Sequence, residues 1–160
     1  MYPTKNDLPE ATRRKMIELC NARLADAIDL QTQTKQAHWN VKGPHFIALH
    51  ELFDKVNADV EDYVDLIAER AVQLGGTADG TARSIAKRST LQEYPVKTGN
   101  DRQHIEALSS VLAAFGKLAR KAIEESDSAG DADTNDIFVE ISRGVDKWLW
   151  FVEAHLQSDG

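Results

Sequence analysis

Apolar residues recur every three or four positions along four long segments of the chain, and almost nothing alternates with the period of a strand. The spacing predicts helices over residues 8–37, 45–74, 101–126 and 133–156. The second segment carries the clearest pattern, formed by Phe46, Leu49, Phe53, Val56, Val60, Ile67 and Leu74. The predicted fold class is therefore all-α.

Residues that favour helix ends stand between these segments. Asn100 is suited to cap the third helix, and Gly75–Gly76 is expected to end the second. Asp7, followed by Pro9 and Glu10, resembles a capping box at the start of the first helix.

The connections between the helices are unequal in length. Those between the first two and the last two helices are short, so each pair is expected to be antiparallel. The middle connection, 75–100, is about 25 residues long, far above the usual few. A connection of this length lets the chain return along the bundle and start the third helix parallel to the second. This is the ferritin-like four-helix arrangement with one long crossover, and residues 81–87 are expected to form a short extra helix within it.

Size and charge limit the class of protein. A chain of 160 residues is expected to form a single domain over 1–160 with a short tail at 1–7. Its formal net charge of −7 argues against a globally basic nucleic-acid binder. We expect no membrane span and no secretory signal, and the single cysteine, Cys20, fits a reducing compartment, so the predicted location is the cytoplasm.

Four potential metal ligands share one stripe of the second predicted helix. At about 100° per residue, His50, Asp54, Asp65 and Glu69 fall within an arc of about 100°. Because His50 and Asp54 each follow a residue of the apolar stripe by one position, their own stripe should face away from the core, towards a neighbouring subunit.

The two halves of this stripe are too far apart to share a metal within one chain, since 15 residues of helix span about 22 Å. An antiparallel copy related by a two-fold axis near residues 59 and 60 would place His50 and Asp54 of one chain opposite Asp65 and Glu69 of the other. His38, at the end of the first helix, is expected to lie beside His50. Two imidazoles and three carboxylates suit iron, with zinc or manganese as competitors.

The same part of the chain resembles the DNA-protection-during-starvation (Dps) family. The resemblance rests on residues 34–43, 46–51, 68–76 and 146–151, and it covers nearly the whole sequence. It implies a homo-dodecameric, hollow ferritin-like cage that oxidises Fe(II) with hydrogen peroxide, or less readily with O2, at inter-subunit ferroxidase sites. Ferric oxyhydroxide would be stored inside, so that the protein protects against oxidative stress.

The resemblance also implies roles for individual residues. The family's ferroxidase ligands correspond to His38, His50, Asp54, Asp65 and Glu69. Trp39 matches an aromatic position near that site, where it would pass electrons or quench radicals, or else simply pack.

Further acidic residues match other features of the family. Asp131 and Asp136, with Asp133 and Glu140 nearby, match acidic three-fold pores through which iron enters. Glu51 is a weaker candidate for mineral nucleation on the inner wall.

Other interpretations are less well supported. A ferritin with its di-iron site inside one bundle would need Glu-x-x-His motifs, and the sequence has none. The stretch 50–54 lacks the second histidine of a zinc-protease motif. A non-catalytic DNA-compacting or structural bundle remains the alternative, but DNA binding is doubtful because Lys5 is the only cation before the first helix. His45, His104 and His155 are expected at the surface or at helix ends, and Trp150 in the core.

Overall fold

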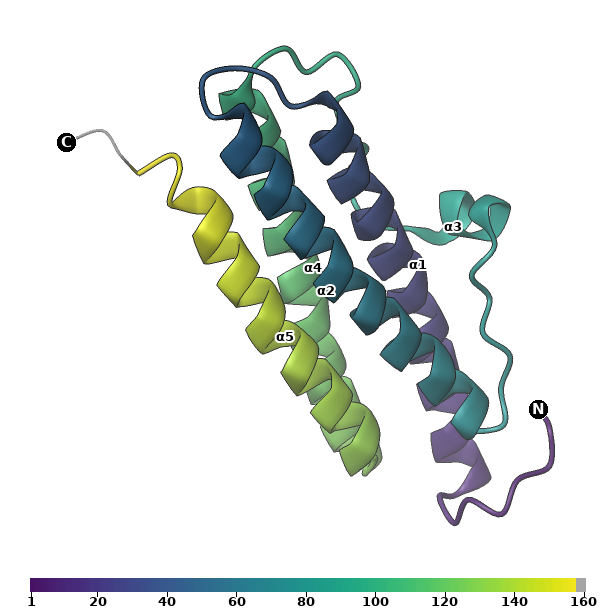
Figure 1. Cartoon of the computed structure of the whole chain (residues 1–160). Coiled ribbons are helices and arrows are strands. Elements are labelled where there is room, and N and C mark those ends of the chain that lie inside the picture. The colour runs from purple at the N-terminus through teal and green to yellow at the C-terminus, as the bar shows by residue number, and fades with distance from the viewer. Residues whose placement is uncertain (158–160) are drawn as a thin grey trace.

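The computed structural model describes residues 1–157 and has only helices as regular secondary structure there. The helices are α1 (Glu10–Asn40), α2 (Phe46–Gln73), α3 (Ala82–Arg88), α4 (Asp101–Ala129) and α5 (Ala132–Glu153). Four of them form the bundle, and α3 lies outside it beside α1 (Figure 1). The predicted all-α class and the short extra helix in the crossover are confirmed. Within the described residues, none of the helices is long and apolar enough to cross a membrane.

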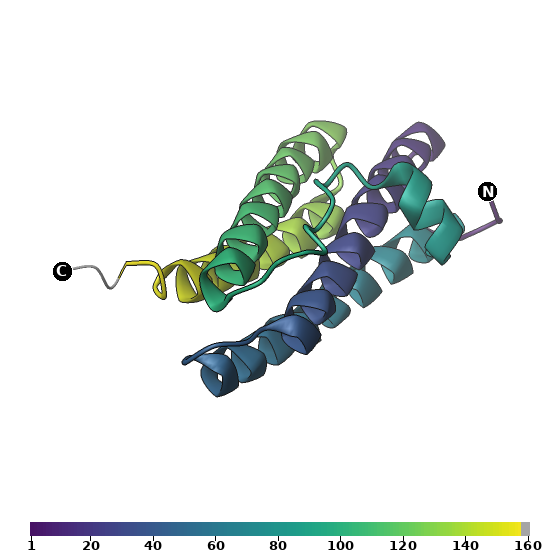
Figure 2. The same cartoon turned by 90° about the horizontal axis from the view of Figure 1, so that it is seen from above.

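Contacts between helix ends establish the directions of the four bundle helices. His45, at the start of α2, contacts Asp101 at the start of α4, with 2.9 Å between Nδ1 and Oδ2. At the opposite end, the Thr12 hydroxyl of α1 donates to the Ala129 carbonyl of α4. Helices α2 and α4 therefore run parallel, as the long connection between them requires (Figures 1 and 2).

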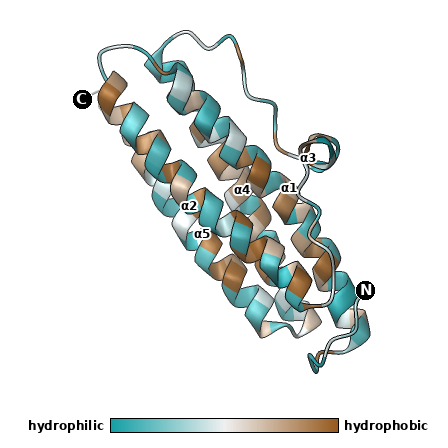
Figure 3. Ribbon diagram, turned by 45° about the vertical axis from the view of Figure 1, so that its right-hand side comes forward, coloured by the Kyte–Doolittle hydropathy of each residue, from teal (hydrophilic) through white to brown (hydrophobic). Residues whose placement is uncertain are grey.

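The core runs along the axis of the bundle, and the polar residues lie on its outer faces (Figure 3). Burying a Leu or Phe side chain contributes about 1.5–3 kcal/mol, so this core is the main source of stability. Its largest fully buried side chains are Phe53, Phe115, Phe138, Met16, Leu24, Leu30, Leu49, Ile67, Leu74, Leu108, Leu112 and Ile141.

Two aromatic residues depart from the predicted core. Phe46 is 41% exposed and lies against the ring of His50 at the start of α2, with 5.2 Å between ring centroids. The expectation that Trp150 is buried is wrong, since 62% of it is exposed. Trp148 takes the core position instead, and two further residues turn the helix by about 200°, which carries Trp150 to the outer face.

Two of the three predicted helix-end signals are confirmed. The Asn100 side chain accepts from the backbone N–H of Gln103, and Gly75 follows α2 with a φ of +89°. The predicted capping box is wrong. Pro9 occupies the N-cap of α1 without a side-chain cap, and the nearby Leu8 N–H bonds to Asn6.

Side chains of α1 hold the crossover against the bundle. Asp26 is fully buried and accepts from both the backbone N–H and the hydroxyl of Thr90. Gln33 donates to the carbonyl of Gln92, 2.9 Å away. These bonds satisfy polar groups of a segment without regular secondary structure, which explains how a long link keeps a defined path.

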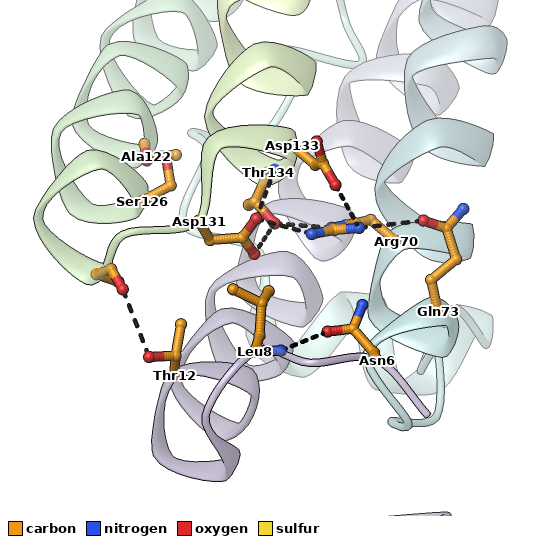
Figure 4. Close-up of polar contacts among 11 residues, drawn as sticks. Asn6, Leu8, Thr12, Arg70, Gln73, Ala122, Ser126, Asp131, Asp133 and Thr134 are labelled. Atoms are coloured by element: carbon orange, nitrogen blue, oxygen red, sulfur yellow. Dashed lines mark hydrogen bonds and ion pairs between the residues drawn. The ribbon is translucent and has the colours of Figure 1, made fainter. Parts of the chain in front are cut away.

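A buried ion pair joins the end of α2 to the start of α5 (Figure 4). Arg70 Nη2 lies 2.7 Å from Asp131 Oδ1, and both side chains are buried. Arg70 also donates to the Thr134 hydroxyl, while the Asp131 carboxylate caps α5 by accepting from the Thr134 N–H and hydroxyl. The charges are compensated inside the network, which is the condition for burying them at low cost.

Arg70→Met should therefore destabilise the protein by about 3–5 kcal/mol, because it leaves the Asp131 carboxylate buried without its cation. The matched control is Arg14→Met, which breaks the exposed Arg14–Glu10 pair and should change stability little. Chemical denaturation at one fixed subunit concentration measures both. Equal effects of the two substitutions would contradict this account of the network.

Candidate metal centre

Two predicted ligands meet where α1 ends and α2 begins. The rings of His38 and His50 are stacked, with centroids 3.7 Å apart. Each ring contacts the other residue's backbone: His38 Nδ1 lies 2.7 Å from the His50 carbonyl oxygen, and His50 Nδ1 lies 2.9 Å from the His38 carbonyl oxygen. The two contacts fix both rings relative to the α1–α2 hairpin.

These contacts determine which ring nitrogens are free. A carbonyl oxygen only accepts hydrogen bonds, so Nδ1 of both His38 and His50 must carry the proton. In the neutral rings, the lone pair is then on Nε2, the nitrogen left to bind a metal. Orientation of a histidine ligand by a carbonyl on its other nitrogen is a usual feature of protein metal sites.

Asp54 lies one turn after His50 on α2 and is exposed. Its carboxylate accepts a 2.7 Å bond from the Lys35 ammonium, and Oδ1 is 3.9 Å from His38 Nδ1. The hydrogen bond from Lys35 holds the pKa of Asp54 below its ordinary value. In the isolated protomer, a lysine cation therefore neutralises the carboxylate that is predicted to bind iron.

Asp65 and Glu69 are also exposed, further along α2. The prediction that this acidic stripe faces away from the protomer's core is confirmed by that exposure. In residues 1–157, no three or more His, Cys, Asp or Glu side chains are grouped so as to hold a metal ion. Of the five predicted ligands, the structure brings the rings of His38 and His50 into contact and places Asp54 Oδ1 3.9 Å from His38 Nδ1, whereas Asp65 and Glu69 lie further along α2.

Trp39 and Glu51 flank this region. Trp39 is 67% exposed, and the Lys35 ammonium lies 6.0 Å from its ring centroid. Its exposure gives no support to a packing role within the protomer. Glu51 is exposed on α2, next to His50.

The predicted pore residues differ in their surroundings. Asp131 is only 1% exposed, and its carboxylate is engaged by Arg70 and Thr134. Asp136, Asp133 and Glu140 are exposed on α5. Asp131 thus has a structural role in the protomer, because its carboxylate caps α5 by accepting from the Thr134 N–H.

The remaining histidines were expected at the surface or at helix ends. His45 and His155 are exposed, and His104 lies at a helix end, in the first turn of α4, although only 1% of it is exposed. The sequence signal for this burial was that His104 lies on the face of α4 that carries Leu108 and Val111, since residues four and seven positions apart share one side of a helix. The contact of Lys35 with Asp54 was also missed. Its sequence signal was the position of Lys35 on α1, one turn before His38.

The chain is similar to the same group of proteins at the level of its domain family, its sequence and its structure. A ferritin-like domain matches residues 17–159. The chain is 47% identical over 156 residues to a DNA protection during starvation protein of Agrobacterium fabrum, covering 98% of this chain and 96% of that protein. Among solved structures, the tetragonal form of Mycobacterium smegmatis Dps matches with a TM-score of 0.92 and 33% identity, covering 98% of this chain and 95% of that one. DpsA14 from Streptomyces coelicolor matches with a TM-score of 0.93 and 34% identity, covering 99% and 94%.

The histidine geometry predicts ring tautomers. In the metal-free protein, neutral His38 and His50 should both carry the proton on Nδ1, because each Nδ1 faces a carbonyl oxygen. Nitrogen NMR of the histidine rings, assigned by single substitutions, measures this. An Nε2–H tautomer at either residue would disprove the proposed orientation of the free lone pairs.

Proposed function

Because the chain belongs to the Dps family of ferritin-like proteins, we propose that it is an iron-storing ferroxidase whose sites are shared between two subunits of a homo-dodecamer. Its substrates are Fe(II) and hydrogen peroxide, or less readily O2, and its product is ferric oxyhydroxide stored inside a hollow shell. The consequence is protection of the cell from oxidative damage.

The observation that carries this proposal is the oriented histidine pair next to an exposed acidic stripe. Nε2 of His38 and His50 is left free by the carbonyl contacts at Nδ1. Asp54, Asp65 and Glu69 are all exposed on α2, the helix that carries His50. Three carboxylates brought together at an interface repel one another unless a cation lies among them, so a metal ion would stabilise the assembled site.

Each group has a distinct part in the chemistry. His38 and His50 would bind Fe(II) through Nε2, and the three carboxylates would balance the higher charge of Fe(III). Two Fe(II) ions supply the two electrons that convert one peroxide and two protons to two waters. Because iron supplies both electrons to the same peroxide, no hydroxyl radical is released. Zinc competes for the same donor set.

Entry and mineral growth would use other carboxylates. Exposed Asp136, with Asp133 and Glu140 on the same helix, is suited to line an acidic pore that concentrates Fe(II). We place Asp131 in the pore wall as a structural residue, because Arg70 holds its carboxylate. Exposed Glu51 remains our candidate for nucleation of the mineral.

The alternative is a non-catalytic DNA-compacting or structural bundle. The segment before α1 is exposed over most of its length but carries only one cation, Lys5. Because DNA affinity depends mainly on cations that neutralise phosphates, we expect no gel shift of duplex DNA near neutral pH. A salt-sensitive shift without ferric product would favour the alternative.

Substitution of either half of the site should abolish ferroxidase activity. We expect His50→Ala and Asp65→Ala to oxidise Fe(II) no faster than buffer, whereas exposed His155→Ala should match the unmodified protein. The measurement is ferric absorbance after anaerobic Fe(II) loading and addition of peroxide, at about two irons per peroxide. Rapid oxidation by both site variants would overturn the proposed ferroxidase site.

Mixed oligomers test whether the site is shared. If His50→Ala and Asp65→Ala chains are unfolded together and reassembled at random, half of the two-fold pairs are mixed. In a mixed pair, one site has both defects and the other has none, so about a quarter of the original activity should return. Activity that stays at zero in properly assembled mixtures would place both residues in the same site of one chain.

A further inference from the structure

A tyrosine–histidine pair lies between the crossover and α4. The hydroxyl oxygen of Tyr94 is 2.5 Å from Nδ1 of His104. Tyr94 is half-buried, and burial raises the pKa of its phenol well above the ordinary value. The phenol therefore keeps its proton and donates it in this hydrogen bond, and His104 Nδ1 accepts.

His104 is arranged as a base that is neutral at rest. Burial, the largest effect, lowers the pKa of this side chain, so the ring holds no extra proton near neutral pH. The nearby Asn40 backbone and the negative charge of Asp101 act in the opposite direction, whereas Lys42 lowers the pKa further. The Asn40 backbone and Asp101 thus stabilise the imidazolium once a proton arrives, although the imidazolium is absent at rest. Nε2 of His104 is buried without a hydrogen-bond partner in the described chain.

The pair is connected to the surroundings of the proposed iron site. Tyr94 and Trp39 line one cavity of about 800 Å³, together with Lys35 and Asn57. The Asn40 backbone, which directly follows Trp39 in the chain, lies close enough to His104 to affect the pKa of its ring. Trp39 in turn follows the proposed ligand His38 directly in α1.

We propose that Tyr94 and His104 form a proton-coupled redox pair that receives oxidising equivalents escaping from the iron site, with Trp39 as the intermediate carrier. This role rests on the proposed ferroxidase function. It concerns the one-electron side reaction, in which peroxide meets a single Fe(II) and yields Fe(III), hydroxide and hydroxyl radical.

The transfer is balanced at each step. Hydroxyl radical takes an electron from the Trp39 indole and becomes hydroxide. The oxidised indole takes an electron from Tyr94, whose phenolic proton moves to His104 Nδ1. The result is a neutral tyrosyl radical and an imidazolium. A second Fe(II) later returns the electron through Trp39, the proton goes back to the phenolate oxygen, and the net change is one further Fe(II) oxidised to Fe(III).

Movement of the proton to a base already in contact is the essential physical element. Removing an electron from a phenol makes it a strong acid, so oxidation is difficult unless the proton leaves at the same time. The 2.5 Å contact provides that path without movement of either side chain. Tyr2, an exposed tyrosine near the N-terminus, is the matched control, because no histidine is among its hydrogen-bond partners in the described chain.

The first experiment needs no iron. A ruthenium polypyridyl complex and persulfate, excited by a laser flash, oxidise the assembled protein, and transient absorption follows the tyrosyl radical. The signal should appear in the unmodified protein and in Tyr2→Phe, and disappear in Tyr94→Phe. In His104→Gln the rate should fall about 100-fold, the lower end for losing a positioned proton acceptor, and in Trp39→Phe the radical yield should fall. The unmodified rate should slow in D2O.

Each outcome decides one proposal. A radical that persists in Tyr94→Phe, or a rate unchanged in His104→Gln and in D2O, overturns the redox pair and leaves the contact as a tether of the crossover. Thermal unfolding and oligomer size, measured for every variant, distinguish that result from misfolding. Freeze-quench electron paramagnetic resonance after sub-stoichiometric Fe(II) and peroxide then tests the iron-dependent step. A flash signal without any iron oxidation would support the pair and reject the ferroxidase proposal.

Discussion

The antiparallel packing of α1 on α2 is the contact on which the other features depend. It buries the apolar faces of both helices and provides the surface against which α4 and α5 complete the core. It also brings the end of α1 to the start of α2, where His38 and His50 exchange contacts with each other's carbonyls. The two proposed metal ligands are thus oriented by the same packing that stabilises the protomer.

The outer face of α2 carries several carboxylates, and the protomer neutralises only part of their negative charge. Lys35 neutralises Asp54, but Asp65 and Glu69 are exposed without an ion pair in the described part of the chain. Exposure to water makes this arrangement tolerable in a single chain. Covering the stripe with a second copy would remove that water, so the interface and the bound cation would stabilise each other.

The crossover has a comparable double role. Asp26 and Gln33 hold it on α1, while the contact between Tyr94 and His104 holds its later part on α4. These bonds satisfy the polar groups of a long segment and, at the same time, place a phenol in the wall of the cavity that Trp39 also lines.

Much of the fold follows from local rules that the sequence displays directly. Helical spacing of residues such as Phe53 and Val60 determines which face is buried, Asn100 caps α4, and the long link determines that α2 and α4 are parallel. The stripe that contains Asp54 and Asp65 was likewise predictable, because it depends only on 3.6 residues per turn.

The contacts that join distant segments were decided by the tertiary structure. Asp131 was predicted at a pore and lies buried against Arg70, 61 positions away in the chain. His104 is buried against Tyr94 of the crossover, and Trp150 is turned outward because Trp148 fills the core. The sequence alone determined the helices, their directions and the faces they present, since those depend on neighbours within a few turns. Only the folded chain determined which charge meets which partner, because a side chain's partner depends on how separate helices pack.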